Sequence, residues 1–220
     1  VLASIADEAA IEPGQTVLEI GPGLGTLTSE LLRRGARVVA VEFDAELARK
    51  LPGQFPGTNL EGSNQDVLQF DLAGLPMGYK VVANVPYYIT SKIVEHLLSA
   101  GNKPALAVLL VQKEVAERLA AGPGDMSLMA LGAQLFAETR LGRVVTADYF
   151  TPPPKVDSQV IVLTTRPASL VSPEDERALF RAAKAGFGNR RKKLRTAIAA
   201  GLAIDKSDAE RLLNAAGINP

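Results

Sequence analysis

Residues 84–88, Asn-Val-Pro-Tyr-Tyr, combine side chains that could act together on one nitrogen atom. They follow an apolar run from Tyr79 to Ala83, which has the composition of a buried strand, and they precede a predicted helix that opens at Thr90 and Ser91. An amide, a proline with a fixed φ and an aromatic ring therefore leave the end of one strand together. This combination suits the methylation of an amino group whose lone pair is delocalised into an aromatic base.

The exocyclic N6 of adenine is such a group, and it is a poor nucleophile. Hydrogen-bond acceptors on its N–H groups localise the lone pair, and the side-chain oxygen of Asn84 can be one of them. The carbonyl oxygen of Val85 or of Pro86 can be the second. Tyr87 can stack on a base that has left its helix. This chemistry depends on positioning and electrostatics, without a metal or a strong base. The structural alternative is a turn with a buried tyrosine.

A glycine-rich turn at residues 21–25, Gly-Pro-Gly-Leu-Gly, follows the apolar run at 16–20. Glycines allow the backbone to approach a ligand closely, and ligands of parallel α/β sheets bind beyond the carboxyl ends of the strands. The spacing differs from the G-x-G-x-x-G of dinucleotide sites. Glu19, just before the turn, suits an ammonium or sulfonium group better than phosphates. We therefore predict an S-adenosylmethionine site that includes Glu19, Gly21 and Gly23.

Two further acidic residues come at the ends of the next two predicted strands. Glu42 can accept hydrogen bonds from a ribose diol, and Asp66 can accept one from the amino group of adenine. A tight turn without a ligand is the structural alternative for the glycine loop, and the two acidic strand ends argue against it. We interpret Asp44 as a helix cap and Asp71 as a turn residue. His96 is predicted to have no catalytic role.

Apolar runs alternate with helical segments through the first half of the chain. Such runs indicate a mostly parallel sheet that is covered by helices on both faces. The predicted strands of this half lie at residues 16–20, 37–41, 59–63, 80–83 and 105–111. The sequence therefore predicts an α/β fold, a Rossmann-like S-adenosylmethionine-dependent methyltransferase domain.

The pattern changes after residue 112. A predicted strand at 136–145 and another at 158–165 flank an extended loop at Thr151-Pro152-Pro153-Pro154. Predicted helices follow a linker at 167–173, and they cover residues 174–187, 190–200 and 207–216. We therefore expect two domains, the methyltransferase domain at 1–166 and a small all-helical RNA-binding domain at 167–220.

Composition excludes some classes of protein. The 220 residues carry 24 basic and 24 acidic side chains, so the net charge favours no partner. There is no cysteine, which excludes disulfides and cysteine metal sites and fits a reducing cytosol. No apolar run has the length of a membrane span. We expect a cytoplasmic monomer without a metal. Because the sequence opens inside a helical pattern, we also expect an earlier segment to precede it.

A basic cluster lies near the end of the chain, within the predicted helix at 190–200. It consists of Arg190, Arg191, Lys192, Lys193 and Arg195. Lysine and arginine contacts with phosphates give salt-sensitive affinity that does not depend on sequence. A solvated charged helix is the alternative, but no acidic residue lies between Arg181 and Arg195. We therefore predict contact with RNA, with Arg181, Lys184 and Lys155 as weaker candidates.

Four segments together resemble the ribosomal RNA adenine dimethyltransferases, and the resemblance extends from Val17 to Pro220. The segments are 19–28 (EIGPGLGTLT), 84–91 (NVPYYITS), 150–158 (FTPPPKVDS) and 187–194 (FGNRRKKL). The bacterial small-subunit members are the most similar. The resemblance implies dimethylation of N6 of two adjacent adenosines near the 3′ end of 16S rRNA, within the small ribosomal subunit. It also implies that Asn84 contacts the cofactor and that Phe150 is a second aromatic residue against the target base.

This chain departs from the family pattern at two positions of the loop. Tyr88 replaces the usual asparagine and Val85 the usual leucine, and neither change removes the amide, the proline or the first ring. The family also begins with a cofactor-contacting G-Q-x-F-L segment that this chain lacks, so the cofactor site is expected to be incomplete on one side.

Three alternatives remain from the sequence. One is a 23S rRNA adenine N6-methyltransferase of the macrolide-resistance type, which has the same loop. The second is a ribosome-assembly or nucleic-acid-binding factor whose catalysis is dispensable, and the third is an NAD-dependent dehydrogenase. The segment Phe150–Ser158 and the basic cluster favour the small-subunit enzyme.

Overall fold

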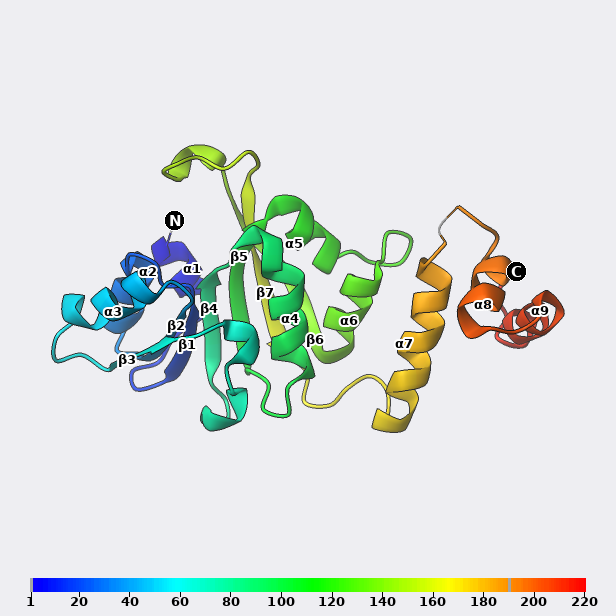
Figure 1. Ribbon diagram of the computed structural model, residues 1–220, viewed down its shortest axis with the longest axis horizontal. Coiled ribbons are helices and arrows are strands. Elements are labelled where there is room, and N and C mark those ends of the chain that lie inside the picture. Colours follow the sequence, from blue (N-terminus) through cyan, green and yellow to red (C-terminus); the bar gives the residue numbers. More distant parts are fainter. Residues whose placement is uncertain (1, 190) are drawn as a thin grey trace.

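The computed structural model describes residues 2–189 and 191–220, and a seven-stranded sheet forms the centre of this part of the chain (Figure 1). The strands are β1 (Thr16–Ile20), β2 (Arg37–Glu42), β3 (Leu60–Asn64), β4 (Lys80–Asn84), β5 (Leu106–Gln112), β6 (Ala137–Val145) and β7 (Ser158–Thr165). The α-helices are α1 (Leu2–Glu8), α2 (Thr26–Arg33), α3 (Ala45–Gln54), α4 (Thr90–Ser99), α5 (Lys113–Leu119), α6 (Leu128–Phe136), α7 (Pro173–Phe187), α8 (Leu194–Leu202) and α9 (Lys206–Ala215). Short 3-10 helices are η1 (Val67–Gln69), η2 (Leu72–Gly74), η3 (Tyr87–Ile89) and η4 (Ala147–Tyr149).

The sheet is mostly parallel, with the strand order β3-β2-β1-β4-β5-β7-β6. The strands from β3 to β5 in this order are parallel to their neighbours, whereas β7 runs antiparallel to both β5 and β6. Ser158, the first residue of β7, therefore lies opposite Gln112, the last residue of β5. As a result, the start of β7 and the ends of the parallel strands share one edge of the sheet, which we call the carboxyl edge.

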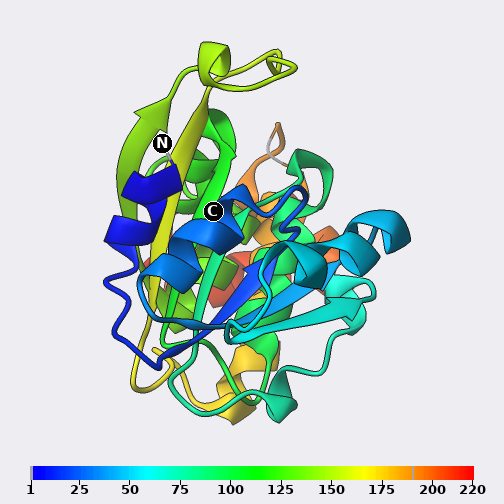
Figure 2. The same ribbon diagram turned by 90° about the vertical axis from the view of Figure 1, so that its left-hand side faces the viewer.

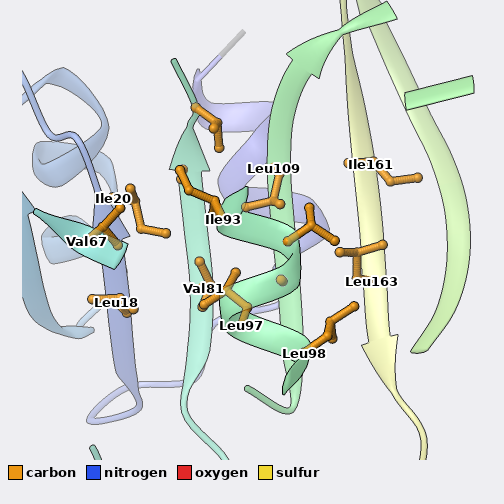
Figure 3. Close-up of a cluster of buried hydrophobic side chains, with 14 of the residues drawn as sticks. Leu18, Ile20, Val67, Val81, Ile93, Leu97, Leu98, Leu109, Ile161 and Leu163 are labelled. Atoms are coloured by element: carbon orange, nitrogen blue, oxygen red, sulfur yellow. The ribbon is translucent and has the colours of Figure 1, made fainter. Parts of the chain in front are cut away.

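Apolar side chains alternate between the two faces of the central strands, so each face has its own core. On one face, Leu18, Val81 and Leu109 share a buried cluster with Ile93 and Leu97 of α4 (Figure 3). Helices α5 and α6 complete this cluster. Burial of each large aliphatic side chain contributes about 1.5–3 kcal/mol. The alternation explains why these strands read as continuous apolar runs in the sequence.

The opposite face packs against the first three helices. Val17, Val82 and Val108 of the sheet cluster there with Ile5 of α1 and Leu31 of α2. Leucine and phenylalanine side chains of α3 and its C-terminal end complete this layer. The predicted α/β fold with helices on both faces of the sheet is therefore present.

Helices α7–α9 lie together at one end of the molecule, beyond the sheet (Figure 1). They bury a separate small cluster that includes Ala185, Ile198 and Leu213. Helices α7 and α8 pack so closely that a Cβ atom on Gly201 would lie 2.4 Å from the Cβ of Ala185. We keep the predicted boundary between residues 166 and 167 as a proposal.

One predicted helix begins later than expected. The sequence predicts a helix at 190–200, but α8 begins at Leu194. The N–H of Lys192 donates to the carbonyl of Asn189 (2.9 Å), which forms a turn after α7, and Lys193 is the extended N-cap of α8. The basic residues before Leu194 that the structure describes therefore lie in a connecting segment.

Candidate active site

The predicted catalytic loop leaves the carboxyl edge in the middle of the sheet. Asn84 is the last residue of β4, lies opposite Leu110 of β5 and is exposed. The next residue, Val85, is buried, and its N–H donates to the carbonyl of Leu110 (3.1 Å). The backbone of the loop is therefore anchored to the neighbouring strand, while the amide of Asn84 faces solvent.

Two acceptors on this loop have no protein partner in the described part of the chain. They are the side-chain oxygen of Asn84 and the carbonyl of Val85. The carbonyl of Pro86, in contrast, accepts from the N–H of Ile89 (3.2 Å) and from the hydroxyl of Thr90 (3.4 Å). Of the two carbonyls that the sequence leaves open, this geometry favours that of Val85. Pro86 instead fixes the turn that begins η3.

A hydrogen bond fixes the far end of the Tyr87 side chain. Its hydroxyl lies 2.6 Å from the Oγ of Ser158, which is fully buried at the start of β7. The residue as a whole is half-buried, so part of it remains accessible to solvent. The ring is therefore held at both ends, by its backbone in η3 and by its hydroxyl on β7.

Asp157, the neighbour of Ser158, organises the loop that carries Phe150. Its Oδ1 accepts from the N–H of Ala147 (3.0 Å), the first residue of η4, and its carbonyl accepts from the N–H of Lys113 (3.0 Å). Phe150 directly follows η4, is half-buried and packs against the α1–α3 side of the core. The adjacent residues Asp157 and Ser158 thus anchor the turn that precedes Phe150 and the hydroxyl of Tyr87.

Sequence reasoning gave no role to either residue of this Asp157-Ser158 pair. Both lie in the segment Phe150–Ser158, which was singled out for its resemblance to the family. The signal that could have identified Ser158 was its position at the start of the last strand. The hydrogen bond itself joins residues 71 positions apart, which no local pattern shows.

The glycine loop has two glycines that face open space. Gly21 and Gly23 have φ values of 65° and 56°, and a Cβ atom on either would meet no atom within 4 Å. A left-handed backbone with room above it is suited to close contact with a ligand. Gly25 is suited to its position for a different reason: a Cβ atom there would lie 2.9 Å from the ring of Phe55, which is too close for a side chain.

Glu42 connects the glycine loop to the end of β2. Its Oε2 accepts from the N–H of Gly23 (3.0 Å), and its Oε1 accepts from the N–H of Asp44 (2.9 Å). Asp44 in turn caps α3 by accepting from the N–H groups of Glu46 and Leu47, as predicted. The buried Glu42 carboxylate therefore sets the shape of the loop, and each oxygen retains a lone pair for a ligand.

Glu19 is fully buried near the carboxyl end of β1, two residues before Gly21. Its Oε2 accepts from the hydroxyl of Thr28 in α2 (2.7 Å), while its Oε1 has no partner among the described residues. Burial raises the pKa of Glu19 to about 7, although the hydrogen bond from Thr28 opposes this effect. The free oxygen of this carboxyl group could accept from an ammonium group or a water at the loop.

Other polar residues near the carboxyl edge have local structural contacts. Asp66 caps η1 by accepting from the N–H of Leu68 (2.9 Å), which orients its carboxylate; its contact with a cofactor remains a prediction. Asp71 caps η2 in the same way, in agreement with its predicted turn role. The Nε2 of His96 lies 3.3 Å from the carbonyl of Phe70.

The basic cluster differs from its prediction in two respects. Arg190 lies outside the described residues, and Arg191, Lys192 and Lys193 are exposed in the segment before α8, not on a helix. Arg195 lies on α8, but its guanidinium pairs with the carboxylate of Glu210 in α9 (2.9 Å). The expectation that no acidic partner lies nearby is therefore wrong for Arg195, because the partner is distant in sequence.

Neither a metal cluster nor a membrane helix is found in residues 2–189 and 191–220. No three or more histidine, cysteine, aspartate or glutamate side chains gather there as metal ligands would. No helix in the same residues has both the length and the apolar character to cross a membrane.

Sequence comparisons identify one family over nearly the whole chain. A family model described as ribosomal RNA adenine dimethylase matches residues 1–219. The "Ribosomal RNA small subunit methyltransferase A" of Dehalococcoides mccartyi (strain ATCC BAA-2266 / KCTC 15142 / 195) is 42% identical, and the match covers 100% of this chain and 77% of that protein. The protein of the same name from Moorella thermoacetica is 40% identical and is covered to 81%, again over 100% of this chain.

Solved structures show the same fold. The crystal structure of a dimethyladenosine transferase from Plasmodium falciparum has a TM-score of 0.79 and 29% identity, over 100% of this chain and 80% of that one. The crystal structure of the 23S rRNA methyltransferase ErmE has a TM-score of 0.78 and 30% identity, over 99% and 88% of the two chains. The Rossmann-like methyltransferase fold predicted from the sequence is thereby confirmed.

The buried carboxyl group of Glu19 predicts a pH-dependent stability. Its ordinary pKa of 4.5 applies to the unfolded chain, whereas the folded value is about 7. Between these values the folded state binds more protons, so the stability of the ligand-free protein falls as the pH rises through this range, by up to about 3 kcal/mol. Glu19→Gln keeps an oxygen for Thr28 and carries no charge. We expect this variant to be more stable than the wild type at about pH 8, and the difference to shrink to about 1 kcal/mol near pH 5.

Urea unfolding at about pH 5 and about pH 8 measures this difference. Glu61→Gln is the matched control, because Glu61 is an exposed acid on the edge strand β3, separated from β1 by β2. An equal effect of Glu19→Gln at the two pH values would contradict the assignment.

Proposed function

Because the chain belongs to the ribosomal RNA adenine dimethylase family, we propose that it dimethylates N6 of adenosines in the RNA of the small ribosomal subunit, with S-adenosylmethionine as the donor. One observation carries the proposal beyond the family match. The Asn84 side chain and the Val85 carbonyl lie at the carboxyl edge as a pair of acceptors without a protein partner in the described chain, beside a tyrosine that is held at both ends. This is the environment that an amino group on a base requires.

The substrate we propose is two adjacent adenosines near the 3′ end of 16S rRNA in the small subunit. The relatives with 40–42% identity are named for the small subunit, whereas the 23S methyltransferase shares less of its sequence. Fold similarity alone does not separate the two, since the TM-scores are nearly equal. A ribosomal substrate would place the enzyme in the bacterial cytoplasm, and we expect a monomer there.

The glycine loop fits S-adenosylmethionine in its chemistry. Gly21 and Gly23 leave an open cradle, and Glu19 offers a buried oxygen to a ligand ammonium group. Helix α2 begins without a side-chain cap, so the N–H groups of its first turn can bind a carboxylate. Glu42 and Asp66 are the acceptors we assign to the ribose and the adenine of this molecule. When bound, it would supply a methyl group on a sulfonium, from which a neutral thioether leaves as the methyl group is transferred.

The residues of the loop have distinct roles in the proposed reaction. Asn84 Oδ1 and the Val85 carbonyl accept from the two N–H groups of adenine N6, which localises the lone pair on the nitrogen. Tyr87 stacks on the base, and Phe150 is the proposed second ring. After the first transfer only one N–H remains, so only one acceptor is needed for the second. The methylated nitrogen loses one proton after each transfer, and this proton passes to solvent water, since Asn84 is exposed and its oxygen only accepts a hydrogen bond from the N–H.

We propose that the exposed residues Arg191, Lys192 and Lys193 bind the phosphate backbone of the RNA. Arg190 belongs to the same proposal by sequence alone. Arg195 contributes less, because its charge is partly neutralised by Glu210. Side chains in an exposed segment can follow an irregular RNA surface, and their contribution should weaken as salt rises.

Removal of the Asn84 amide tests the activity directly. Asn84→Ala deletes one acceptor, and we expect kcat to fall by about 100-fold or more, while binding of the RNA changes little. Small subunits from a strain that lacks this methylation are incubated with enzyme and S-adenosylmethionine, and dimethyladenosine is quantified by mass spectrometry.

Asn214→Ala, an exposed asparagine on α9, is the matched control for this assay. Methylation of 23S RNA alone would replace our substrate with that of the macrolide-resistance type. Full activity of Asn84→Ala would show that the loop is not catalytic.

A second prediction concerns the cofactor. Glu42→Ala removes both the acceptor for the Gly23 N–H and the acceptor for the ribose, so we expect about 10- to 100-fold weaker binding of S-adenosylmethionine in calorimetry. Glu61→Ala is the control, since it removes an exposed acid from the next strand. Binding of NAD in place of S-adenosylmethionine by the wild type would overturn the cofactor assignment.

A third prediction concerns the hydrogen bond that holds the Tyr87 ring. Tyr87→Phe and Ser158→Ala each leave one hydroxyl without its partner, and the double variant removes both groups. We expect about a tenfold loss of kcat for each single variant. The double variant should lose little more than a single one, because the two groups act through one contact.

Tyr79→Phe is the control for this cycle, because its hydroxyl contacts the carbonyl of Asn102 at the opposite edge of the sheet. This variant should keep its full kcat. Losses that multiply in the double variant would show that the two hydroxyls act independently.

A further inference from the structure

Each of the two aromatic residues assigned to the target base has an exposed tyrosine beside it in the chain. Tyr88 follows Tyr87 and is 85% exposed, and Tyr149 precedes Phe150 and is 68% exposed. We propose that Tyr88 and Tyr149 form a second stacking surface, which binds the unpaired nucleotides that flank the target adenosine. This inference rests on the proposed function, and it assigns a role to two residues outside the acceptors and rings described above.

Both tyrosines lie at the carboxyl edge of the sheet. Tyr88 belongs to η3, directly after the loop that ends β4. Tyr149 ends η4, in the segment between β6 and β7, which projects beyond the sheet (yellow-green in Figures 1 and 2). Contacts at the start of β7 connect the two places, because Ser158 binds Tyr87 and Asp157 binds Ala147. Both tyrosines thus belong to segments that are anchored at the start of β7, where the proposed base site lies.

The exposure of these rings is built into ordered turns. The N–H of Ile89 donates to the carbonyl of Pro86 (3.2 Å) across Tyr88, and the N–H of Tyr149 donates to the carbonyl of Thr146 (3.2 Å). A short hydrogen-bonded turn presents each ring to solvent with few backbone conformations to lose. A ring that is already held in place stacks on a base at a lower entropic cost.

The charges nearby suit a polyanion. Lys92 follows Tyr88 by one helical turn, and Lys155 lies in the same segment as Tyr149; both are exposed and form no salt bridge within residues 2–189 and 191–220. Asp148 is the exposed acid of this segment and opposes the two lysines. Aromatic rings with neighbouring cations are the pattern of proteins that bind single-stranded nucleic acid. We therefore assign the surface to RNA and not to a protein partner.

This surface would also offset an energetic cost. A base that enters the site must leave its neighbours, which costs a few kcal/mol of stacking. A ring that stacks on a flanking base replaces part of the lost contact. The proposed surface therefore favours the opened state of the RNA, in which the target adenosine is accessible.

Leucine and phenylalanine substitutions separate stacking from simple apolar contact. Tyr88→Leu and Tyr149→Leu keep apolar area but lose the aromatic face, whereas Tyr88→Phe and Tyr149→Phe keep the face and lose only the hydroxyl. With whichever ribosomal RNA substrate the wild type methylates, we expect KM to rise about 5- to 100-fold for each leucine variant. We expect kcat to change less than about twofold, and the phenylalanine variants to match the wild type.

Met77→Ala is the control for loss of an exposed apolar side chain, since Met77 is 83% exposed and lies before β4, at the opposite edge. Thermal unfolding and calorimetry with S-adenosylmethionine verify that each variant is folded and binds the donor. If the leucine variants are active and their KM equals that of Met77→Ala, this inference is overturned. The proposed function then remains intact. A wild type that methylates no ribosomal RNA overturns both.

Discussion

The contact between Tyr87 and Ser158 joins the two halves of the site, and it exists because β7 runs against its neighbours. If β7 were parallel, its first residue would lie at the amino edge, remote from the end of β4. Its reversal brings Ser158 to the carboxyl edge and places the Phe150 loop beside the Asn84 loop. The antiparallel strand is thus the constraint that turns two separate loops into one site.

The cofactor side of the proposed site depends on carboxyl groups that are mostly removed from water. Glu42 uses both oxygens to hold the backbone of the loop, whereas Glu19 has one oxygen engaged by Thr28 and a pKa raised by burial. An uncompensated buried carboxyl group lowers the stability of the empty protein at neutral pH. A cationic ligand beside Glu19 would compensate this buried charge. Part of the affinity that we propose for the donor would therefore come from removing the destabilisation that Glu19 causes in the ligand-free protein.

Local patterns in the sequence predicted the positions of those parts of the proposed site that are local in the chain. The acceptors around Asn84, the glycine loop and the caps at Asp44 and Asp71 depend on residues within a few positions, and the structure has each at the predicted place. The role of Ser158 and the pairing of Arg195 with Glu210 depend on residues that meet only in the folded chain. The choice of Val85 over Pro86 likewise required the hydrogen bonds of η3.

The segment between β6 and β7 and the glycine loop connect strands of the sheet in different ways. It connects two adjacent antiparallel strands, so its length and composition can change without moving any other strand. The glycine loop, in contrast, is followed by a helix that crosses to the next parallel strand, and its geometry is fixed by the core on both sides. Over evolutionary time, enzymes of this architecture could therefore acquire new RNA targets through the β6–β7 hairpin while the methyl-donor site stays unchanged.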